Sequence, residues 1–192
     1  MVEACVRAGA CALQIREKHL DDAALLEWCT EVRRVVHACN RPDGGRTALI
    51  INDRPEIALA CGADGVHLGA RDRDVAEVRE EVGNRLLIGA TCHSVDEARA
   101  AARAGADHLG VGPMFLTTTK DTGTPQGASL LADVLAAVDL PCFAIGGITA
   151  RNVSSLVAAG ATGVAVCQAV IGAVDPGTAL RELDRALAGG QA

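Results

Sequence analysis

The sequence predicts an α/β fold, a (β/α)8 barrel that lacks its first β-strand in this chain. The first observation behind this prediction is a repeated Gly-Ala-x-x-apolar pattern, which follows a helical stretch and precedes a short apolar run at Gly9, Gly62, Gly105 and Gly160. Glycine commonly ends helices in the left-handed conformation, so each unit is expected to be a helix, a tight turn and a buried strand. The second is composition: 49% of residues are apolar but only 2% are aromatic, which is typical of a core of Ala, Val and Leu around parallel strands.

The apolar runs predict seven strands, and amphipathic stretches predict helices between them. The chain begins in a helix over 2–8, the clearest amphipathic helix spans 22–39, and another begins at the capping box Ser94-x-x-Glu97. The irregular spacing of the glycine turns argues against a stacked solenoid and favours alternating β and α units. The strands are expected at 12–15, 48–52, 65–68, 86–89, 108–112, 141–145 and 163–167.

Seven strands are one fewer than a (β/α)8 barrel needs, and the simplest explanation is that the first strand is absent. An open sheet with an edge is the alternative, although nothing resembles the Gly-x-Gly-x-x-Gly turn of a dinucleotide fold. Residues 1–192 are expected to form a single domain. A barrel without one strand exposes two unpaired edges, which favours a natural start upstream of Met1.

Composition also narrows the class of function. The net charge of −6 argues against a general nucleic-acid surface. No apolar run reaches the roughly 20 residues of a membrane span, and no signal-peptide pattern opens the chain. The eight cysteines are scattered without a Cys-x-x-Cys pair, so we expect reduced thiols rather than a zinc or disulfide framework. These features predict a cytoplasmic enzyme that acts on small molecules.

Lysine is scarce in this chain: Lys18 and Lys120 stand against sixteen arginines. Lys18 closes the run Gln14-Ile15-Arg16-Glu17-Lys18, and Lys120 closes Thr117-Thr118-Thr119-Lys120. A chain that uses arginine wherever a surface cation suffices is expected to keep lysine where a compact ammonium is needed. The two lysines are therefore candidates for one anion-binding site, although lysine is ordinarily a solvated surface charge.

Polar residues gather where the predicted strands end, which is where barrels carry their active sites. Arg16, Lys18 and Lys120 supply cations, and the glycines after the last strands suit a phosphate. Asp53 and Asp72 provide hard oxygen ligands that suit Mg²⁺ beside phosphate oxygens. The candidates at these ends are Gln14, Arg16, Lys18, Asn52, Asp53, His67, Thr91, His93, Thr117, Thr119, Lys120, Gly146, Gly147, Cys167 and Gln168.

Several candidates also have a purely structural interpretation. Asp72 could cap a helix that starts near Arg73, and Asp53 could simply pair with Arg54. His67 and His108 could be hydrogen-bonded core histidines, and we favour that interpretation for His108. These alternatives lose force together, because ligand-type residues recur at the strand ends and are rare elsewhere.

The motifs resemble those of the thiamine phosphate synthase family over nearly the whole chain. They are Gln14-x-Arg16-Glu17-Lys18, Asn52-Asp53-Arg54, Gly65-Val66-His67-Leu68-Gly69-x-x-Asp72, Gly112-Pro113-x-Phe115-x-Thr117-x-Thr119-Lys120 and Ala144-Ile145-Gly146-Gly147-Ile148. The resemblance implies a transferase that joins a hydroxymethylpyrimidine diphosphate to a thiazole phosphate and releases pyrophosphate.

The resemblance also implies a role for each matched residue. The diphosphate would be held by Arg16, Lys18, Asn52 and Lys120, and Mg²⁺ by Asp53 and Asp72. Gln14, Thr91 and His67 would lie at the pyrimidine. The thiazole phosphate would be held by Thr117, Thr119, Gly147 and the backbone around Cys167 and Gln168.

The chain departs from the family pattern at four positions. Ala70 stands where Gln is common, Leu116 where Pro is common, Gln168 where Ser is common, and Thr91 where Ser is common. These changes leave the predicted diphosphate and metal residues whole, but they put the fit of the pyrimidine in question. A thiazole tautomerase-like isomerase, a sugar-phosphate epimerase and a non-catalytic barrel fragment that binds a phosphate ligand remain as alternatives.

Overall fold

The computed structural model describes residues 1–39, 41–116 and 124–189. Within them, seven strands form one sheet in which every neighbouring pair is parallel and the spatial order follows the sequence, so the predicted α/β fold is confirmed. In the described ranges the sheet does not close with eight strands, because β1 and β7 are its two ends. The strands are β1 (Ala12–Ile15), β2 (Ala48–Asn52), β3 (Gly65–Leu68), β4 (Leu87–Cys92), β5 (His108–Val111), β6 (Cys142–Ile145) and β7 (Val164–Ala165).

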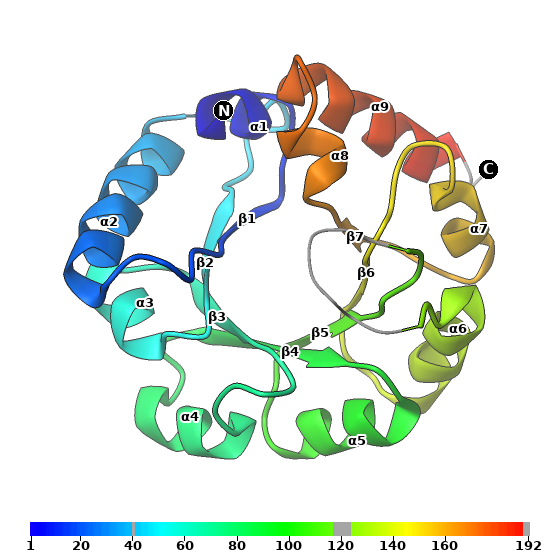
Figure 1. Ribbon diagram of the computed structural model, residues 1–192, viewed down its shortest axis with the longest axis horizontal. Helices are drawn as coiled ribbons and strands as arrows, with labels where there is room; N and C mark the ends of the chain where they lie inside the picture. Colours follow the sequence, from blue (N-terminus) through cyan, green and yellow to red (C-terminus); the bar gives the residue numbers. More distant parts are fainter. Residues whose placement is uncertain (40, 117–123, 190–192) are drawn as a thin grey trace.

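The helices form an outer ring around the strands, as Figure 1 shows. No helix in the described ranges combines the length and apolar character that crossing a membrane would require. The helices are α1 (Val2–Arg7), α2 (Asp22–Ala38), α3 (Pro55–Cys61), α4 (Val75–Val82), α5 (Val95–Arg103), α6 (Gly127–Ala137), α7 (Val153–Ala158), α8 (Gln168–Ile171) and α9 (Pro176–Gly189).

The glycine turns have the predicted conformation. The φ angles of Gly9, Gly62, Gly105 and Gly160 are 102°, 67°, 95° and 97°, a region that glycine enters without the steric cost other residues incur. Each glycine follows the end of a helix and lets the chain turn toward the next strand. The Gly-Ala repeat therefore marks the helix-to-strand boundaries, as the sequence pattern predicts.

Two of these turns continue into an aspartate that is bonded to the preceding strand. The Asp64 carboxylate accepts the backbone N–H of Leu49 at 2.8 Å, and the Asp107 carboxylate accepts that of Ile88 at 2.7 Å. Arg79 also donates to Asp107 at 2.5 Å. These bonds fix the amino ends of the strands, which is the edge of the sheet opposite to the expected chemistry.

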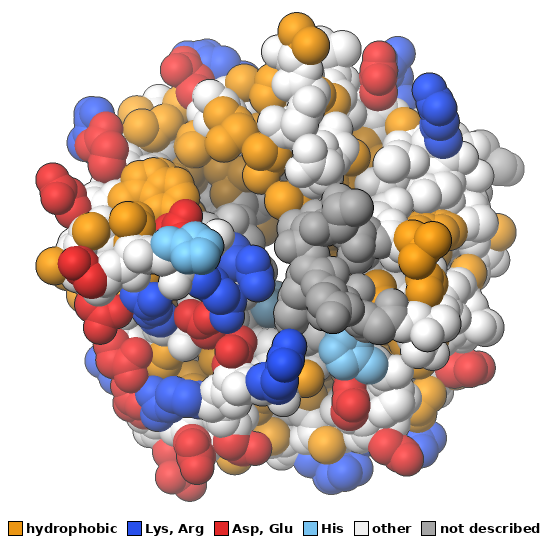
Figure 2. Space-filling model, in the orientation of Figure 1, with side chains coloured by type: hydrophobic (Ala, Val, Ile, Leu, Met, Phe, Trp, Pro, Cys, Tyr) orange, Lys and Arg blue, Asp and Glu red, His pale blue; other side chains and the backbone are white. Residues whose placement is uncertain are grey.

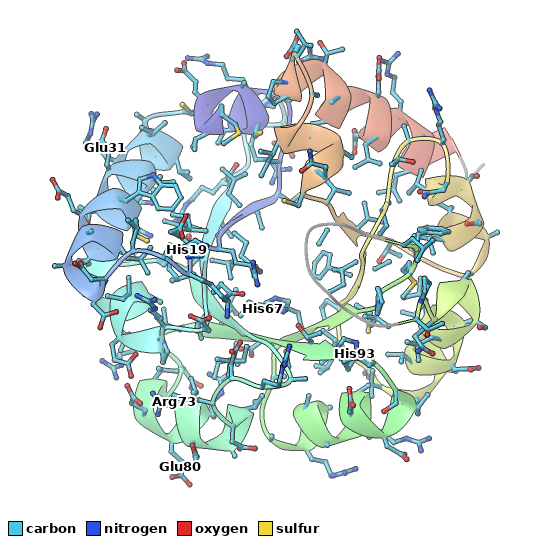
Figure 3. The ribbon with its side chains drawn as sticks, in the orientation of Figure 1. His19, Glu31, His67, Arg73, Glu80 and His93 are labelled. Atoms are coloured by element: carbon cyan, nitrogen blue, oxygen red, sulfur yellow. The ribbon has the colours of Figure 1, made fainter. Side chains whose placement is uncertain are left out.

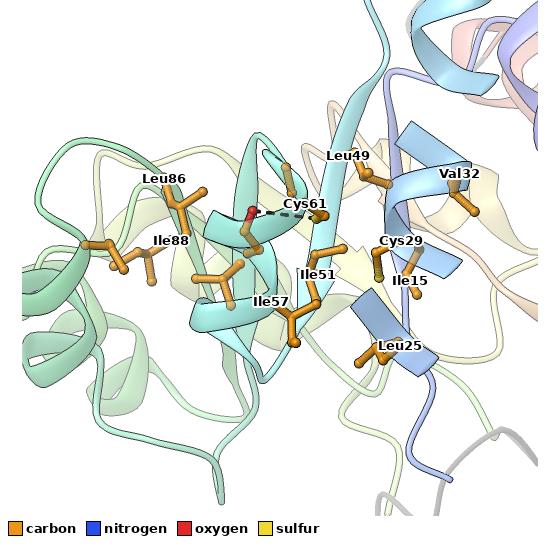
Figure 4. Packing of buried hydrophobic residues seen from close by; sticks show 14 of the residues in the cluster. Ile15, Leu25, Cys29, Val32, Leu49, Ile51, Ile57, Cys61, Leu86 and Ile88 are labelled. Atoms are coloured by element: carbon orange, nitrogen blue, oxygen red, sulfur yellow. Dashed lines mark hydrogen bonds between the residues drawn. The ribbon is translucent and has the colours of Figure 1, made fainter. Parts of the chain in front are cut away.

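The hydrophobic core lies between the outer surface of the sheet and the helices. Alternate strand residues supply it: Leu49 and Ile51 of β2, for example, pack with Leu25 and Cys29 of α2 (Figure 4). Leu49 and Ile51 are 0% and 1% exposed. The remaining residues of each strand therefore face the interior of the curved sheet.

Some boundaries and faces differ from the sequence-based prediction. β4 extends to Cys92, whereas β7 contains two residues only. Trp28 lies in the predicted amphipathic helix but is not part of its buried face, since 42% of its surface is exposed. In the predicted capping box, Ser94 accepts the N–H of Glu97, but the Glu97 carboxylate binds the N–H of His93 instead of that of Ser94. The box is therefore shifted by one residue on one side.

Candidate active site

The carboxyl ends of the strands bring cations and carboxylates together on one face. Figure 2 shows this face, with Lys and Arg side chains gathered beside Asp and Glu near its centre. Gln14 lies on β1 between Leu13 and Ile15, which both pack against the outer core, so Gln14 points to the interior. Arg16 follows β1 and is exposed. Both residues thus lie at the edge of the sheet where the sequence predicts them.

Lys18 links the two predicted metal-ligating carboxylates. Its Nζ lies 2.7 Å from Asp53 Oδ2 and 4.0 Å from Asp72 Oδ1. The Lys18 side chain is 43% exposed, whereas those of Asp53 and Asp72 are 18% and 20% exposed. Three candidates from three different strand ends therefore meet in one cluster that solvent can reach.

Asp53 is held in an unusual backbone conformation. Its φ of 57° is the only positive value among the described non-glycine residues. Its N–H donates to the carbonyl of His67 at 2.9 Å, which ties the end of β2 to β3. Arg54 binds Asp22 at 2.7 Å and lies 3.8 Å from Asp53, so Asp53 pairs mainly with Lys18 rather than with its neighbour. A left-handed aspartate costs on the order of 1 kcal/mol, and such strain is frequent at functional sites.

Asp72 does not cap a helix. The residue that caps α4 is Asp74, whose carboxylate accepts the N–H of Ala76. Asp72 instead accepts the N–H of Gly69 at 2.7 Å, within the loop that follows β3. This bond leaves its second carboxylate oxygen directed at Lys18, as the site interpretation requires.

His67 and Thr91 meet inside the sheet. His67, which is 9% exposed, lies near the centre of the ring of strands in Figure 3. Its Nε2 is 2.9 Å from the hydroxyl oxygen of Thr91. Asn52 is the register partner of His67 on the neighbouring strand β2 and is half-buried, so it lies beside the same histidine. His67 therefore contacts Thr91, another predicted site residue, rather than being only part of the core.

A second group of candidates lies at the ends of β6 and β7. Gly147 has a φ of 65°, and a Cβ there would lie 2.9 Å from that of Phe115. The carbonyl of Gly147 accepts a bond from the Asn152 side chain at 3.0 Å. The segment after β5 is therefore held against the turn after β6. Cys167 is exposed and precedes the four-residue helix α8, whose first residue is Gln168.

Three predicted site residues lie outside the described residues, namely Thr117, Thr119 and Lys120. The predicted convergence of the two lysines consequently remains a prediction. Among the described residues, no three side chains of the types His, Cys, Asp and Glu cluster as a metal site. The binding of Mg²⁺ by Asp53 and Asp72 consequently also remains a prediction.

His108 was expected in the core, but it lies beside a predicted site residue. Its ring centroid is 5.9 Å from that of His67, which it approaches from β5. Burial lowers the pKa of His108, which favours the neutral ring. Alternation along β5 places His108 on the inner face with Gly110, and this signal could have identified it.

Comparison with known proteins points to the same family as the sequence motifs. The sequence model of the family described as thiamine monophosphate synthase matches residues 1–170. The chain is 44% identical to a thiamine-phosphate synthase of Chloroflexus aurantiacus, over 95% of this chain and 82% of that protein. It is 44% identical to one of Methanoculleus marisnigri, over 96% of this chain and 85% of that protein. A bifunctional protein, ThiM/ThiE of Symbiobacterium thermophilum, is 47% identical, but the chain spans only 37% of its length.

Solved structures agree with the sequence comparison. A thiamine phosphate pyrophosphorylase from Pyrococcus furiosus superposes with a TM-score of 0.87 and 32% identity, and it covers 100% of this chain and 89% of that one. A 3-hexulose-6-phosphate synthase has a TM-score of 0.69 at 17% identity, which shows a shared fold alone. From the motifs, the cluster they form and these matches, the chain belongs to the thiamine-phosphate synthase family.

Proposed function

We propose that this protein joins 4-amino-2-methyl-5-hydroxymethylpyrimidine diphosphate to 4-methyl-5-hydroxyethylthiazole phosphate, giving thiamine phosphate and pyrophosphate. The observation that carries the proposal is the cluster of Lys18 with Asp53 and Asp72, at 2.7 and 4.0 Å, in a member of this family. A departing diphosphate needs compensating positive charge, and a compact ammonium at the carboxyl ends of the strands can supply it.

The reaction needs charge stabilisation more than proton transfer. The carbon–oxygen bond to pyrophosphate breaks and leaves a pyrimidine carbocation, and the thiazole nitrogen then forms the new carbon–nitrogen bond. Arg16, Lys18, Asn52 and Lys120 would hold the diphosphate and stabilise it as it leaves. No general base is required, because the attacking thiazole nitrogen carries no proton.

The other candidates would bind and orient the two substrates. Gln14 and Thr91 would contact the pyrimidine, with His67 behind the Thr91 hydroxyl. The thiazole phosphate would lie at the other end of the site from the pyrimidine. Its proposed contacts are Thr117, Thr119, Gly147 and the backbone around Cys167 and Gln168.

The residues present fit a bound Mg²⁺. Asp53 and Asp72 offer hard carboxylate oxygens, and both are oriented toward one cation, Lys18. These two aspartates would hold the metal, which would neutralise charge on the diphosphate when bound. Lys18 would then exchange part of its contact with the aspartates for contact with phosphate oxygens.

The fold proposal is a (β/α)8 barrel whose first strand is absent from this chain. The seven parallel strands, their order and the similarity to the Pyrococcus furiosus enzyme support it. We expect the enzyme to act in the cytoplasm on small molecules, where its free thiols stay reduced.

A pyrophosphate-release assay tests the proposed function. Release that requires both substrates and Mg²⁺ is the expected result. Binding of the thiazole phosphate without release would instead support an inactive ligand-binding fragment, for which the open ends of the sheet at β1 and β7 are the structural argument. Metal-independent isomerisation of the thiazole would support a tautomerase.

A further inference from the structure

The loop between β1 and α2 carries two proposed diphosphate contacts, Arg16 and Lys18, on a segment that the core does not hold. The loop spans residues 16–21, and none of its side chains is buried. In Figure 1 it runs past the end of β2 before it enters α2. A segment that buries no apolar side chain is held in place by its polar contacts, so these contacts decide where the two cations lie.

Arg54, which follows β2, holds the far end of this loop. Its Nη1 donates to the backbone carbonyl of Leu20 at 3.3 Å and to the carboxylate of Asp22 at 2.7 Å. The two hydrogens of Nη1 can serve both acceptors at once. Asp22 is the first residue of α2, so these bonds fix the point at which the loop becomes a helix. We call the contacts of Arg54 with Leu20 and Asp22 the Arg54 clamp.

The residue before Arg54 holds the middle of the same loop. Asp53 binds the Lys18 ammonium at 2.7 Å, and Arg54 Nε lies 3.8 Å from the other oxygen of that carboxylate. Lys18, Leu20 and Asp22 are therefore tied, at alternate positions, to two consecutive residues after β2. Because Lys18 and Asp22 are close in sequence, the freedom of the Lys18 backbone depends on both ties.

We propose that Arg54 is a positioning residue for the transfer reaction: the Arg54 clamp fixes the β1–α2 loop and thereby holds Lys18 where the diphosphate leaves. The identity of the substrate rests on the proposed function, whereas the structural part concerns the binding of pyrophosphate alone. A charge stabilises a leaving group best when it is already in place, because reorganisation during the reaction costs free energy. Arg54 therefore contributes order to the site through Lys18, without touching the substrate itself.

Two competing interpretations give different results on substitution. The first is an ordinary surface ion pair, since the Asp22 side chain is 79% exposed and that of Arg54 is 26% exposed; its loss would leave the site unchanged. The second is direct binding of phosphate by Arg54. Removing Asp22 would then release the guanidinium for the ligand, and Asp22→Ala would not weaken pyrophosphate binding. The clamp predicts that Arg54→Met and Asp22→Ala weaken that binding to a similar extent.

The first measurement is the Kd of inorganic pyrophosphate in the presence of Mg²⁺, determined by calorimetry on the full chain. Arg54→Met and Asp22→Ala should each raise the Kd about tenfold, the lower end of what a residue that orients a binding group contributes. An unchanged Kd in Asp22→Ala would overturn the proposal, and this exposed position keeps the test valid even if Arg54→Met does not fold.

Arg41→Met is the matched control. Arg41 also binds a carboxylate, that of Asp43 at 2.5 Å, and a backbone carbonyl, that of Arg46 at 3.2 Å. These contacts lie before β2, at the opposite edge of the sheet. The control should therefore leave the Kd of pyrophosphate unchanged, and an equal loss in Arg41→Met would show a general effect on the fold and contradict the positioning role.

The second measurement is a double-mutant cycle with Lys18. In a Lys18→Met background, Arg54→Met should weaken pyrophosphate binding little further, because its effect passes through Lys18. Losses that simply add in the double variant would contradict the proposal, since they would mean that Arg54 acts independently of this lysine.

Steady-state kinetics separates the positioning role from the proposed function. Arg54→Met should lower kcat/KM for the pyrimidine diphosphate about tenfold and leave the KM for thiazole phosphate unchanged, because the described contacts proposed for that ligand follow β6 and β7. Equal effects on both substrates would overturn the proposal. Pyrophosphate binding that depends on Arg54, in a protein that releases no pyrophosphate from the two substrates, would support the clamp and refute the proposed function. Turnover by an enzyme whose pyrophosphate binding ignores Arg54 would do the reverse.

Discussion

Replacing Lys18 with methionine separates its contribution to stability from its contribution to catalysis. The Lys18 ammonium is 2.7 Å from Asp53 and 4.0 Å from Asp72, but the side chain is 43% exposed. An ion pair this open to solvent contributes about 0.2–1 kcal/mol to folding. We therefore expect Lys18→Met to lower the free energy of unfolding by less than about 1 kcal/mol.

The expected effect on turnover is much larger. A preorganised charge aimed at a developing anion is typically worth about 10²–10³ in kcat, or roughly 3–4 kcal/mol. Lys18→Met should therefore reduce pyrophosphate release by that factor while the protein stays folded. Lys18→Arg should also be impaired, because a planar guanidinium is larger than the ammonium that fits between two carboxylates.

Urea denaturation and steady-state pyrophosphate release measure the two effects separately. Arg34→Met is the matched control, since Arg34 pairs with Glu31 at the same 2.7 Å on the outside of α2. This control should lose similar stability and no activity. A Lys18→Met enzyme that turns over within about threefold of wild type would refute the leaving-group role, on the scale of about 1.4 kcal/mol per tenfold. A near-normal Lys18→Arg enzyme would refute the requirement for a compact cation.

Three further predictions concern the metal, the turn after β6 and the thiols. Asp72→Asn should raise the Mg²⁺ concentration for half-maximal turnover at least about tenfold, measured by metal titration, and an unchanged requirement would argue against its role as a ligand. Gly147→Ala should lower the melting temperature more than Gly44→Ala. Both glycines have a positive φ, but only an added Cβ at residue 147 would be crowded, at 2.9 Å from the Cβ of Phe115. Equal shifts would contradict the crowding argument. The thiols can be alkylated at pH 8 and analysed by mass spectrometry: exposed Cys167 should react, whereas Cys92, whose pKa is raised to about 12 by burial, should not. Thiazole phosphate should slow the alkylation of Cys167. No slowing would place that ligand elsewhere.

The strands and turns were largely predictable because their signals are local. An apolar run before polar residues defines β2, and the Gly-Ala pairs mark where the chain turns into a strand. The meeting of Lys18 with Asp53 and Asp72 could also be predicted, since parallel strands place their carboxyl ends at one edge. The end of β4, by contrast, was predicted at residue 89, because the sequence marks that boundary only weakly. The strand extends to Cys92 and therefore includes Thr91.

What the sequence could not predict depends on register between strands. The approach of His67 to His108 across Gly89 requires three strands to align residue by residue, and no local pattern specifies that alignment. The left-handed backbone of Asp53 is equally hidden, because the residue type permits the conformation without requiring it. Whether Asp72 or Asp74 caps α4 depends on the conformation of the loop before the helix, which the sequence alone does not specify.

The aspartates at the amino ends of the strands have a consequence for how such chains can be recombined. The Asp64 carboxylate accepts a hydrogen bond from the main-chain N–H of Leu49, and that of Asp107 accepts one from Ile88. Each therefore binds a backbone group that every residue except proline has. A strand–helix unit exchanged from a related enzyme would keep these main-chain bonds whatever residues follow the junction. It would also have to keep the arginines that pair with the two aspartates, Arg46 with Asp64 and Arg79 with Asp107, because those contacts are between side chains.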